Sequence, residues 1–423
     1  MARRLYPGRR PEYSNLKFKH KDVRARERTP ETTVEGASKE AGEILPDVVE
    51  DSACGHDGLA VAMPSPDYAL RNREPLSQRQ RYRRAYGALD LGTNNCRLLV
   101  AHPRPRGFKV IGAFSRIIRL GEGVSISGRL SEAAIERTID ALHACANKMR
   151  ALNVERSGLI ATEACRVAIN APEFLGRVHR ETGLDIKIVS REAEARLAVS
   201  GCASLIDPAC DLVLVFDIGG GSSELIWLDL SRRRCFDRSA PADRLELQAC
   251  IAAWTSLPVG VVTLAERFGG VFVCPQVFQA MVDHVGTLLA PFEAVHKFRA
   301  RLPGSRTHLL GTSGTVTTIA GVHLGLPRYD RNRVDGCWLD TGQARAVSAR
   351  LLTADYEARV AEPCIGKERA DLVLAGCAIL EAMLQMWPCA RLRVADRGLR
   401  EGILATLMAE DGVHRNEIGR AHV

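Results

Sequence analysis

The sequence contains no CxxC, HExxH or HxH motif, although its 423 residues include 13 cysteines and 11 histidines. Zinc ligation needs such clustered thiolates or imidazoles, so their absence argues against a zinc site. The cysteines are odd in number and scattered from Cys54 to Cys389, which argues against a disulfide framework. This distribution is typical of reduced, mostly buried thiols in a cytoplasmic protein.

Long apolar runs are also missing. No stretch reaches the roughly 18 apolar residues that a membrane-spanning helix needs. The N-terminal segment MARRLYPGRR carries paired arginines, but no apolar segment follows them, so a secretory signal is not predicted. We therefore expect no membrane contact and a cytoplasmic location.

The net charge of +8 is unevenly distributed. Residues 1–30 hold ten basic residues (Lys or Arg) and three acidic ones (Asp or Glu). Residues 31–70 hold one basic and nine acidic residues, and residues 71–84 hold six basic residues and one acidic residue. Alternating charge blocks rich in Pro, Ser and Gly predict a disordered leader over residues 1–84. A basic arm of this kind can bind polyanions, and a solvated tail is the alternative interpretation. Nucleic-acid binding is expected only through this leader.

A chain of 423 residues exceeds one ordinary core, and 46% hydrophobic residues with 36 glycines suit an α/β protein. Apolar periodicity predicts strands and helices from Tyr86 onward. The predicted strands are Tyr86–Leu91, Arg97–Ala101, Phe108–Leu120, Ser157–Ala161, Asp185–Val189, Asp211–Phe216, Thr307–Leu310 and Arg391–Val394. The predicted helices are Ser131–Leu152, Pro172–Thr182, Arg191–Ser204, Pro275–Lys297, one from Thr315, Arg369–Trp387 and Gly398–Met408.

The pattern of strand, aspartate, glycine turn and strand occurs twice. The segment DLGTNNCRLL begins at Asp90 and DIGGGSSELI begins at Asp217, so that Gly92 aligns with Gly219 and Arg97 with Glu224. Such an internal repeat predicts two related domains that face each other.

The turns predict phosphate binding. Glycines let the backbone approach a phosphate closely and point N–H groups at its oxygens. Asp90 and Asp217 end their strands and suit a hard cation. A third glycine loop, Gly311–Thr315, precedes a predicted helix, whose N-terminus favours anions. For one turn alone, a capped glycine hairpin or a capped strand–helix junction is the alternative. The candidate phosphate contacts are Thr93, Asn94, Asn95, Gly219, Gly220, Gly221, Ser222, Ser223, Gly311, Thr312, Ser313 and Gly314.

Six segments carry a family resemblance: DLGTNNCRLL, ATEACR, REAEARL, DIGGGSSEL, GTSGTVTTIAG and DRGLREG. Together they resemble the exopolyphosphatase / guanosine pentaphosphate phosphohydrolase family, over about residues 85–409. That family belongs to the superfold of actin, sugar kinases and heat-shock chaperones. The resemblance implies an α/β fold with two ribonuclease-H-like domains facing across a cleft, and hydrolysis of terminal phosphoanhydrides with magnesium (Mg2+).

The resemblance also implies residue roles. In REAEARL, Glu194 matches the general base, whereas Ala193 stands where the family has a second glutamate, so that role is absent here. Glu224 resembles a second catalytic carboxylate, and Asp90, Asp217 and Glu224 would hold the metal.

Two arginines are further phosphate candidates. Arg166 resembles an arginine that grips phosphate, with an ion pair to Glu163 as the alternative. Arg97 either contacts phosphate or forms a salt bridge. The segment DRGLREG is interpreted as structural, leading the last helix back to the first domain.

We accordingly predict a leader over 1–84, a first domain over 85–208, a second over 209–397, and a returning helix and tail over 398–423. The predicted function is exopolyphosphatase, with guanosine pentaphosphate as the alternative substrate. Two rival functions are a kinase of the same superfold and a non-catalytic nucleotide-sensing binder. Longer family members carry an additional helical domain, so this chain resembles a short form, and a homodimer would supply the surface that it lacks.

Overall fold

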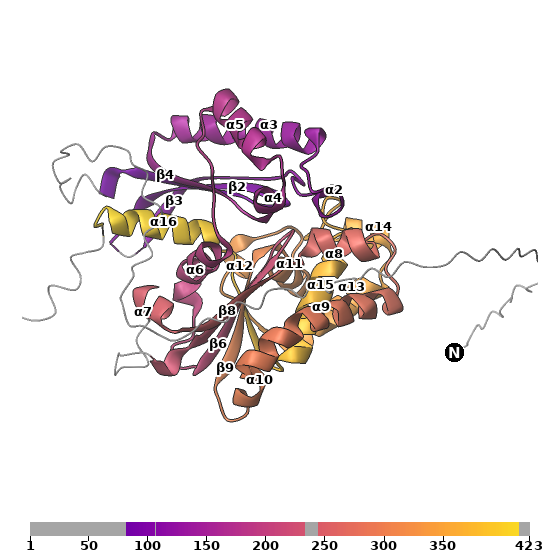
Figure 1. Ribbon diagram of the computed structural model, residues 1–423. Coiled ribbons are helices and arrows are strands. Elements are labelled where there is room, and N and C mark those ends of the chain that lie inside the picture. The colour runs from indigo at the N-terminus through magenta and orange to yellow at the C-terminus, as the bar shows by residue number, and fades with distance from the viewer. Residues whose placement is uncertain (1–81, 106, 233–243, 414–423) are drawn as a thin grey trace, which may run out of the picture. The chain divides into compact units, whose positions relative to one another are not determined.

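The computed structural model describes residues 82–105, 107–232 and 244–413, which fall in one compact unit. The predicted leader lies outside the described residues except for its last three positions. Two mixed sheets form the framework (Figure 1). No described helix is long and apolar enough to cross a membrane.

The first sheet has the strand order β3-β2-β1-β4-β5. Strand β1 pairs antiparallel with β2 and parallel with β4, so the N-terminal meander leads into a parallel half. Its strands are β1 (Ala85–Leu91), β2 (Asn95–Pro103), β3 (Phe108–Ile117), β4 (Val154–Ala161) and β5 (Lys187–Ile188).

The second sheet has the order β10-β11-β9-β6-β7-β8 and repeats this arrangement with one added edge strand. Strand β6 pairs antiparallel with β7 and parallel with β9, as β1 does with β2 and β4. Its strands are β6 (Leu212–Ile218), β7 (Ser223–Asp229), β8 (Ile251–Leu257), β9 (Thr307–Thr312), β10 (Trp338–Asp340) and β11 (Arg391–Val394).

The internal repeat is confirmed at the level of register. Asp90 lies opposite Arg97 in the first hairpin, and Asp217 lies opposite Glu224 in the second. The two turns close alike, since the backbone N–H groups of Gly92 and Gly219 each donate to the carbonyl three residues later, at 2.9 and 3.0 Å. The same local sequence logic therefore builds the same turn twice.

Helices cover both sheets. On the first sheet, α3 and α5 share one hydrophobic core with β1 and β2, and α16 (Leu399–Glu410) packs on the opposite face. The helices of this half are α2 (Val124–Ser127), α3 (Glu132–Ala151), α4 (Glu163–Val167), α5 (Ala171–Thr182) and α6 (Arg191–Cys202).

The second sheet is covered in the same way. Helices α9, α11 and α15 pack on one face, and α6 packs on the other. The remaining helices are α7 (Arg244–Ala249), α8 (Val261–Phe268), α9 (Pro275–His296), α10 (Phe298–Arg301), α11 (Ser313–His323), α12 (Arg331–Val334), α13 (Thr341–Thr353), α14 (Tyr356–Ala361), α15 (Val373–Met386) and α16 (Leu399–Glu410).

Helix α16 returns to the first sheet, as predicted, and lies beside its strands in Figure 1. It packs tightly on α6 through glycines. A Cβ atom at Gly201 would lie 1.8 Å from the carbonyl oxygen of Gly398, and one at Gly402 would lie 2.0 Å from that of Leu197. Only glycine permits these approaches, so the two central helices are held at backbone contact distance.

The sequence prediction was wrong at several element boundaries. The predicted strands Asp185–Val189 and Phe108–Leu120 are shorter, and the predicted helix from Arg369 begins at Val373. Strands β8 and β10 were missed. Strand β10 has only three residues and pairs only with β11 at the sheet edge, so its sequence carries little periodic signal. The domain boundary near residue 208 stays a prediction.

Candidate active site

The two glycine turns meet face to face. A Cβ atom at Gly220 would lie 2.9 Å from Cβ of Thr93, and one at Gly221 would lie 3.0 Å from its Oγ1. A Cβ at Gly260, at the start of α8, would lie 2.4 Å from the Gly220 carbonyl. The glycines are therefore required by this close approach, which places the first turn against the second.

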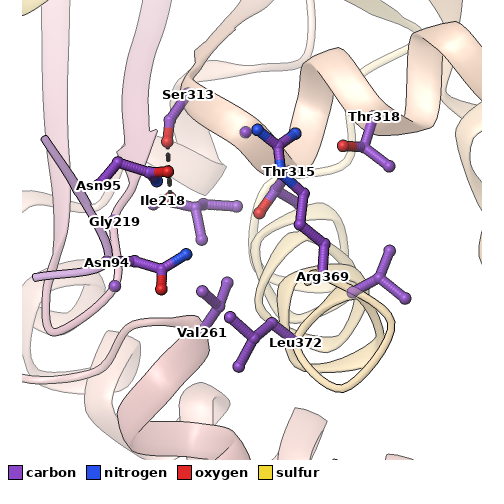
Figure 2. Close-up of a pocket in the computed structure, with 13 residues that line it drawn as sticks. Asn94, Asn95, Ile218, Gly219, Val261, Ser313, Thr315, Thr318, Arg369 and Leu372 are labelled. Atoms are coloured by element: carbon purple, nitrogen blue, oxygen red, sulfur yellow. Dashed lines mark hydrogen bonds between the residues drawn. The ribbon is translucent and has the colours of Figure 1, made fainter. Parts of the chain in front are cut away.

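A pocket opens between the turns and the N-terminus of α11 (Figure 2). Both halves of the repeat line it. Asn94 and Asn95 come from the first turn, and Gly219 and Gly220 come from the second. The side-chain oxygens of both asparagines are buried with no hydrogen-bond partner among the described residues. The pocket therefore presents polar groups that the protein itself leaves unsatisfied.

Two aspartates lie at the base of these turns. Burial raises the pKa of Asp90 to about 6, with Arg97 and Arg400 opposing the rise and the charge of Asp217 adding to it. Burial also raises the pKa of Asp217, against nearby hydroxyls and Arg97. The charge of Asp217 thus acts on the ionisation of Asp90, as the facing repeats predict.

Two glutamates complete a group of four acids. Burial raises the pKa of Glu194 well above its ordinary value, and the charge of Glu224 raises it further. Burial likewise raises the pKa of Glu224 to about 7, and Asp217 adds to the rise. Glu224 accepts hydrogen bonds from Ser222 at 2.7 Å and Ser256 at 2.9 Å. Acids with little exposure whose charges repel one another are typical of a site that binds a cation or holds a proton.

Arg166 contacts Glu194 directly. Its Nη2 donates to Oε2 of Glu194 at 2.5 Å, and its Nη1 donates to Glu163 at 2.7 Å. The ion pair to Glu163 therefore exists together with a contact to the predicted base. Arg97 forms no side-chain hydrogen bond or ion pair within the described residues, yet it lies near Asp90 and Asp217 and lowers the pKa of both.

The third loop begins α11. Ser313 adopts a left-handed backbone with φ of 79°, unusual for a non-glycine residue, and its hydroxyl donates to the carbonyl of Ile218 at 3.0 Å. Ser313 and Gly314 line the pocket. Gly311 does not line it, and a Cβ there would lie 2.6 Å from the ring of Phe216. Thr312 is buried and caps the helix without a side-chain hydrogen bond to it.

Both serines of the second turn already donate hydrogen bonds within the protein. Ser222 donates to Glu224, and Ser223 donates to the carbonyl of Val259 at 2.7 Å. Their contact with phosphate stays a prediction, and the backbone N–H groups of Gly220 and Gly221 are the more available donors, because that of Gly219 already closes the turn.

Sequence reasoning missed Arg369. It lies in the segment before α15 and lines the pocket, and Figure 2 shows its guanidinium beside Thr315. Within residues 82–105, 107–232 and 244–413, that guanidinium has no hydrogen-bond or ion-pair partner. No glycine loop or repeat accompanies it in the sequence, so no local signal indicated the position.

Arg400 was interpreted as structural, yet it lies near Asp90. Burial lowers its pKa, with Glu401 and Asp90 opposing the fall. DRGLREG is therefore both the connection into α16 and a source of positive charge at the site.

Within the described part of the chain, no group of three or more His, Cys, Asp or Glu side chains is arranged to hold a metal ion. Asp90, Asp217 and Glu224 therefore do not form a preassembled three-carboxylate metal centre. Magnesium commonly takes only one or two carboxylates and completes its shell with water and substrate phosphates. Asp90 and Asp217 are both part-buried, and the charge of Asp217 acts on Asp90, which fits that second kind of site.

The model of the Ppx/GppA phosphatase family matches residues 99–411. The chain is 28% identical over 327 residues to a guanosine-5'-triphosphate,3'-diphosphate pyrophosphatase of Photobacterium profundum, covering 77% of this chain and 59% of that protein. It is 27% identical to a Haemophilus influenzae protein provisionally named an exopolyphosphatase, covering 77% of this chain and 91% of that protein.

A solved structure is similar too. The Aquifex aeolicus member of the Ppx/GppA family aligns with a TM-score of 0.61 and 28% identity, over 78% of this chain and 98% of that one. The chain thus spans about three fifths of the longer curated relative and nearly all of the solved structure.

Proposed function

The chain belongs to the Ppx/GppA phosphatase family, and from this premise we propose that it hydrolyses terminal phosphoanhydride bonds, with inorganic polyphosphate as substrate. The observation that carries the proposal is the gathering of four acids with little exposure, the buried Glu224 and the part-buried Asp90, Asp217 and Glu194, beside two facing glycine turns. Such a cluster of carboxylates is costly without a cationic partner. A catalytic task would explain why the sequence retains it.

Glu194 is proposed as the general base. A carboxylate whose pKa is raised by burial accepts a proton more readily from water, while its contact with Arg166 fixes its orientation. Glu224 is held by two serine hydroxyls and is proposed to position the attacking water or a cation.

The phosphate is proposed to lie against Asn94, Asn95 and the backbone of Gly219 and Gly220, with Arg369 at the far wall of the pocket. The transition state of phosphoryl transfer is loose, so fixed donors and charges contribute more than covalent chemistry does. Arg97 and Arg166 lie beside the acids and are proposed to balance the added negative charge.

Magnesium is the proposed cofactor, held by Asp90 and Asp217, with Glu224 nearby. When bound, it would neutralise charge on the phosphoryl oxygens. Burial raises the pKa of these acids, which supports binding of a cation together with the substrate.

Guanosine pentaphosphate is a second candidate substrate. Val261, Leu372 and Val373 form an apolar wall of the pocket, which a polyphosphate chain does not need and a nucleoside would bury. The Photobacterium profundum relative is named for such a substrate. We further propose a cytoplasmic location, because the cysteines of the described ranges are scattered along the chain and mostly buried.

The test is phosphate release by the full chain from polyphosphate, guanosine pentaphosphate and ATP, side by side, with magnesium or with EDTA. We expect release from polyphosphate that EDTA abolishes. Preference for the nucleotide would favour the second substrate. Binding without release would favour a sensor, and turnover only with an added sugar or acid acceptor would favour a kinase.

A further inference from the structure

Glu163 bridges two arginines beside the proposed base. Its Oε2 accepts from Arg166 at 2.7 Å, and its Oε1 accepts from Nη2 of Arg191 at 2.7 Å. Arg166 in turn donates to Glu194 and, through Nε, to the carbonyl of Val189 at 3.1 Å. A single carboxylate that is 7% exposed thus fixes both guanidinium groups.

Glu163 also touches the second phosphate turn. Its Cγ would lie 3.2 Å from a Cβ atom at Gly221. The arginines that it holds are therefore anchored where the turn, α4 and the start of α6 meet. Arg191 itself is the first residue of α6, after the N-cap Ser190.

Arg191 is only partly used by the protein. A guanidinium has five N–H donors, and Nη2 of Arg191 donates to Glu163. Its Nε is buried with no hydrogen-bond partner among the described residues, while the side chain as a whole remains 40% exposed. The guanidinium therefore keeps N–H donors that the protein does not use, and a phosphate oxygen that meets its exposed end would gain a charge-assisted hydrogen bond.

Arg191 lies close to charged groups of the candidate active site. Its hydrogen bond with Glu163 raises its pKa, and the charges of Glu224 and Glu194 add to the rise. The guanidinium therefore lies within electrostatic range of both proposed catalytic carboxylates, on the rim between burial and solvent. An anion entering there would pair with a fixed planar donor rather than with a freely moving side chain.

We propose that Arg191 is a further substrate-binding residue that donates its unused N–H groups to a phosphate oxygen of the bound substrate, and that Glu163 positions it for this contact. The inference rests on the proposed function, since it assigns a contact to the same substrate. Arg191 performs no bond-making step. It contributes binding that is shared by ground state and transition state.

The experiment compares Arg191→Met with Arg196→Met in the full chain. Arg196 lies on the same helix and pairs with Glu192 at 3.0 Å, so it is a matched arginine of an ordinary ion pair. For Arg191→Met we expect KM for polyphosphate to rise about tenfold, the loss of one charge-assisted contact, with kcat changed less than about twofold. Arg196→Met should leave both within about twofold.

Arg191→Lys is the second variant. It keeps the positive charge for Glu163 but lacks the planar guanidinium and its unused N–H groups, so KM should rise by about threefold or more. Unchanged KM in Arg191→Met overturns the inference, whatever happens to its melting temperature. If that variant does not fold, unchanged KM in Arg191→Lys overturns it.

Calorimetric titration with tripolyphosphate in a Glu194→Gln background separates the two proposals. Absence of phosphate release by the unmutated chain would reject the hydrolase function. Equal tripolyphosphate affinity with and without Arg191→Met would reject the role of Arg191 alone, and about tenfold weaker binding would support it.

Discussion

Arg119 and Asp371 lie 252 residues apart, and the guanidinium of one donates to both carboxylate oxygens of the other at 2.9 and 3.0 Å. Arg119 follows β3 of the first sheet, and Asp371 precedes α15 on the second. A second contact lies close by, where Glu266 accepts from the backbone N–H of Gly123 at 2.7 Å. These contacts join the two halves at the pocket wall, because Arg369 and Leu372 flank Asp371.

Replacing Arg119 with Ala should therefore loosen that wall. We expect the free energy of unfolding to fall by about 1 to 2 kcal/mol, since the lost hydrogen bonds are charge-assisted and partly buried. KM for polyphosphate should rise as well. Urea unfolding and steady-state kinetics measure the two effects.

Arg345→Ala is the control for this variant, because Arg345 pairs with Glu381 at 2.9 Å entirely within the second half. It should leave KM unchanged. Equal KM values for the two variants would show that the Arg119 contact does not shape the pocket.

Glu194→Gln should lower kcat by about two to four orders of magnitude, the typical contribution of a general base. Gln keeps the size of the side chain, so substrate binding and the melting temperature should change little. Phosphate release under saturating polyphosphate measures the effect. Near-normal turnover would reassign the base, with Glu224 as the next candidate.

Arg166→Met should shift the acid limb of the pH profile of kcat to higher pH. Burial and Glu224 raise the pKa of Glu194, and Arg166 opposes them. Without the guanidinium the pKa rises further, so more alkaline solution is needed to ionise the base, by about one to three pH units.

The matched control is Arg177→Met on α5, which removes an arginine paired with Glu181. Its pH profile should coincide with that of the unmutated chain. An acid limb of Arg166→Met that stays in place would separate Arg166 from the ionisation of Glu194.

Asp90→Asn should stabilise the metal-free protein at pH 8 while it abolishes hydrolysis. The folded-state pKa of Asp90 is about 6, above the ordinary 3.8, so folding favours the protonated carboxyl. Its contribution to stability is complete below pH 3.8 and is lost as the pH rises through 6. Asn stays neutral, so the variant should be more stable by up to about 3 kcal/mol at pH 8.

Urea unfolding in EDTA at about pH 4, 6 and 8 tests this, with Asp140→Asn on the exposed face of α3 as the control. The stability gain should be smallest at the lowest pH. A gain that is independent of pH, or a loss at the highest, would contradict the assigned burial of the Asp90 charge.

The sequence by itself determined the two repeated turns. Strand, aspartate and glycine follow one another along the chain, so the local pattern predicts Asp90 and Asp217 at equivalent positions, and the register confirms it. The return of α16 to the first sheet was also predicted, from the DRGLREG segment.

Only the tertiary structure decided which distant residues share the site. Arg369 comes from a segment without any repeat, and the network from Glu194 through Arg166 and Glu163 to Arg191 depends on how α4 meets α6. The hydrophobic periodicity of a segment indicates whether it forms a helix or a strand, but it does not indicate which other elements pack against it. Charge pairing and burial arise between elements, and these set the ionisation of the four acids.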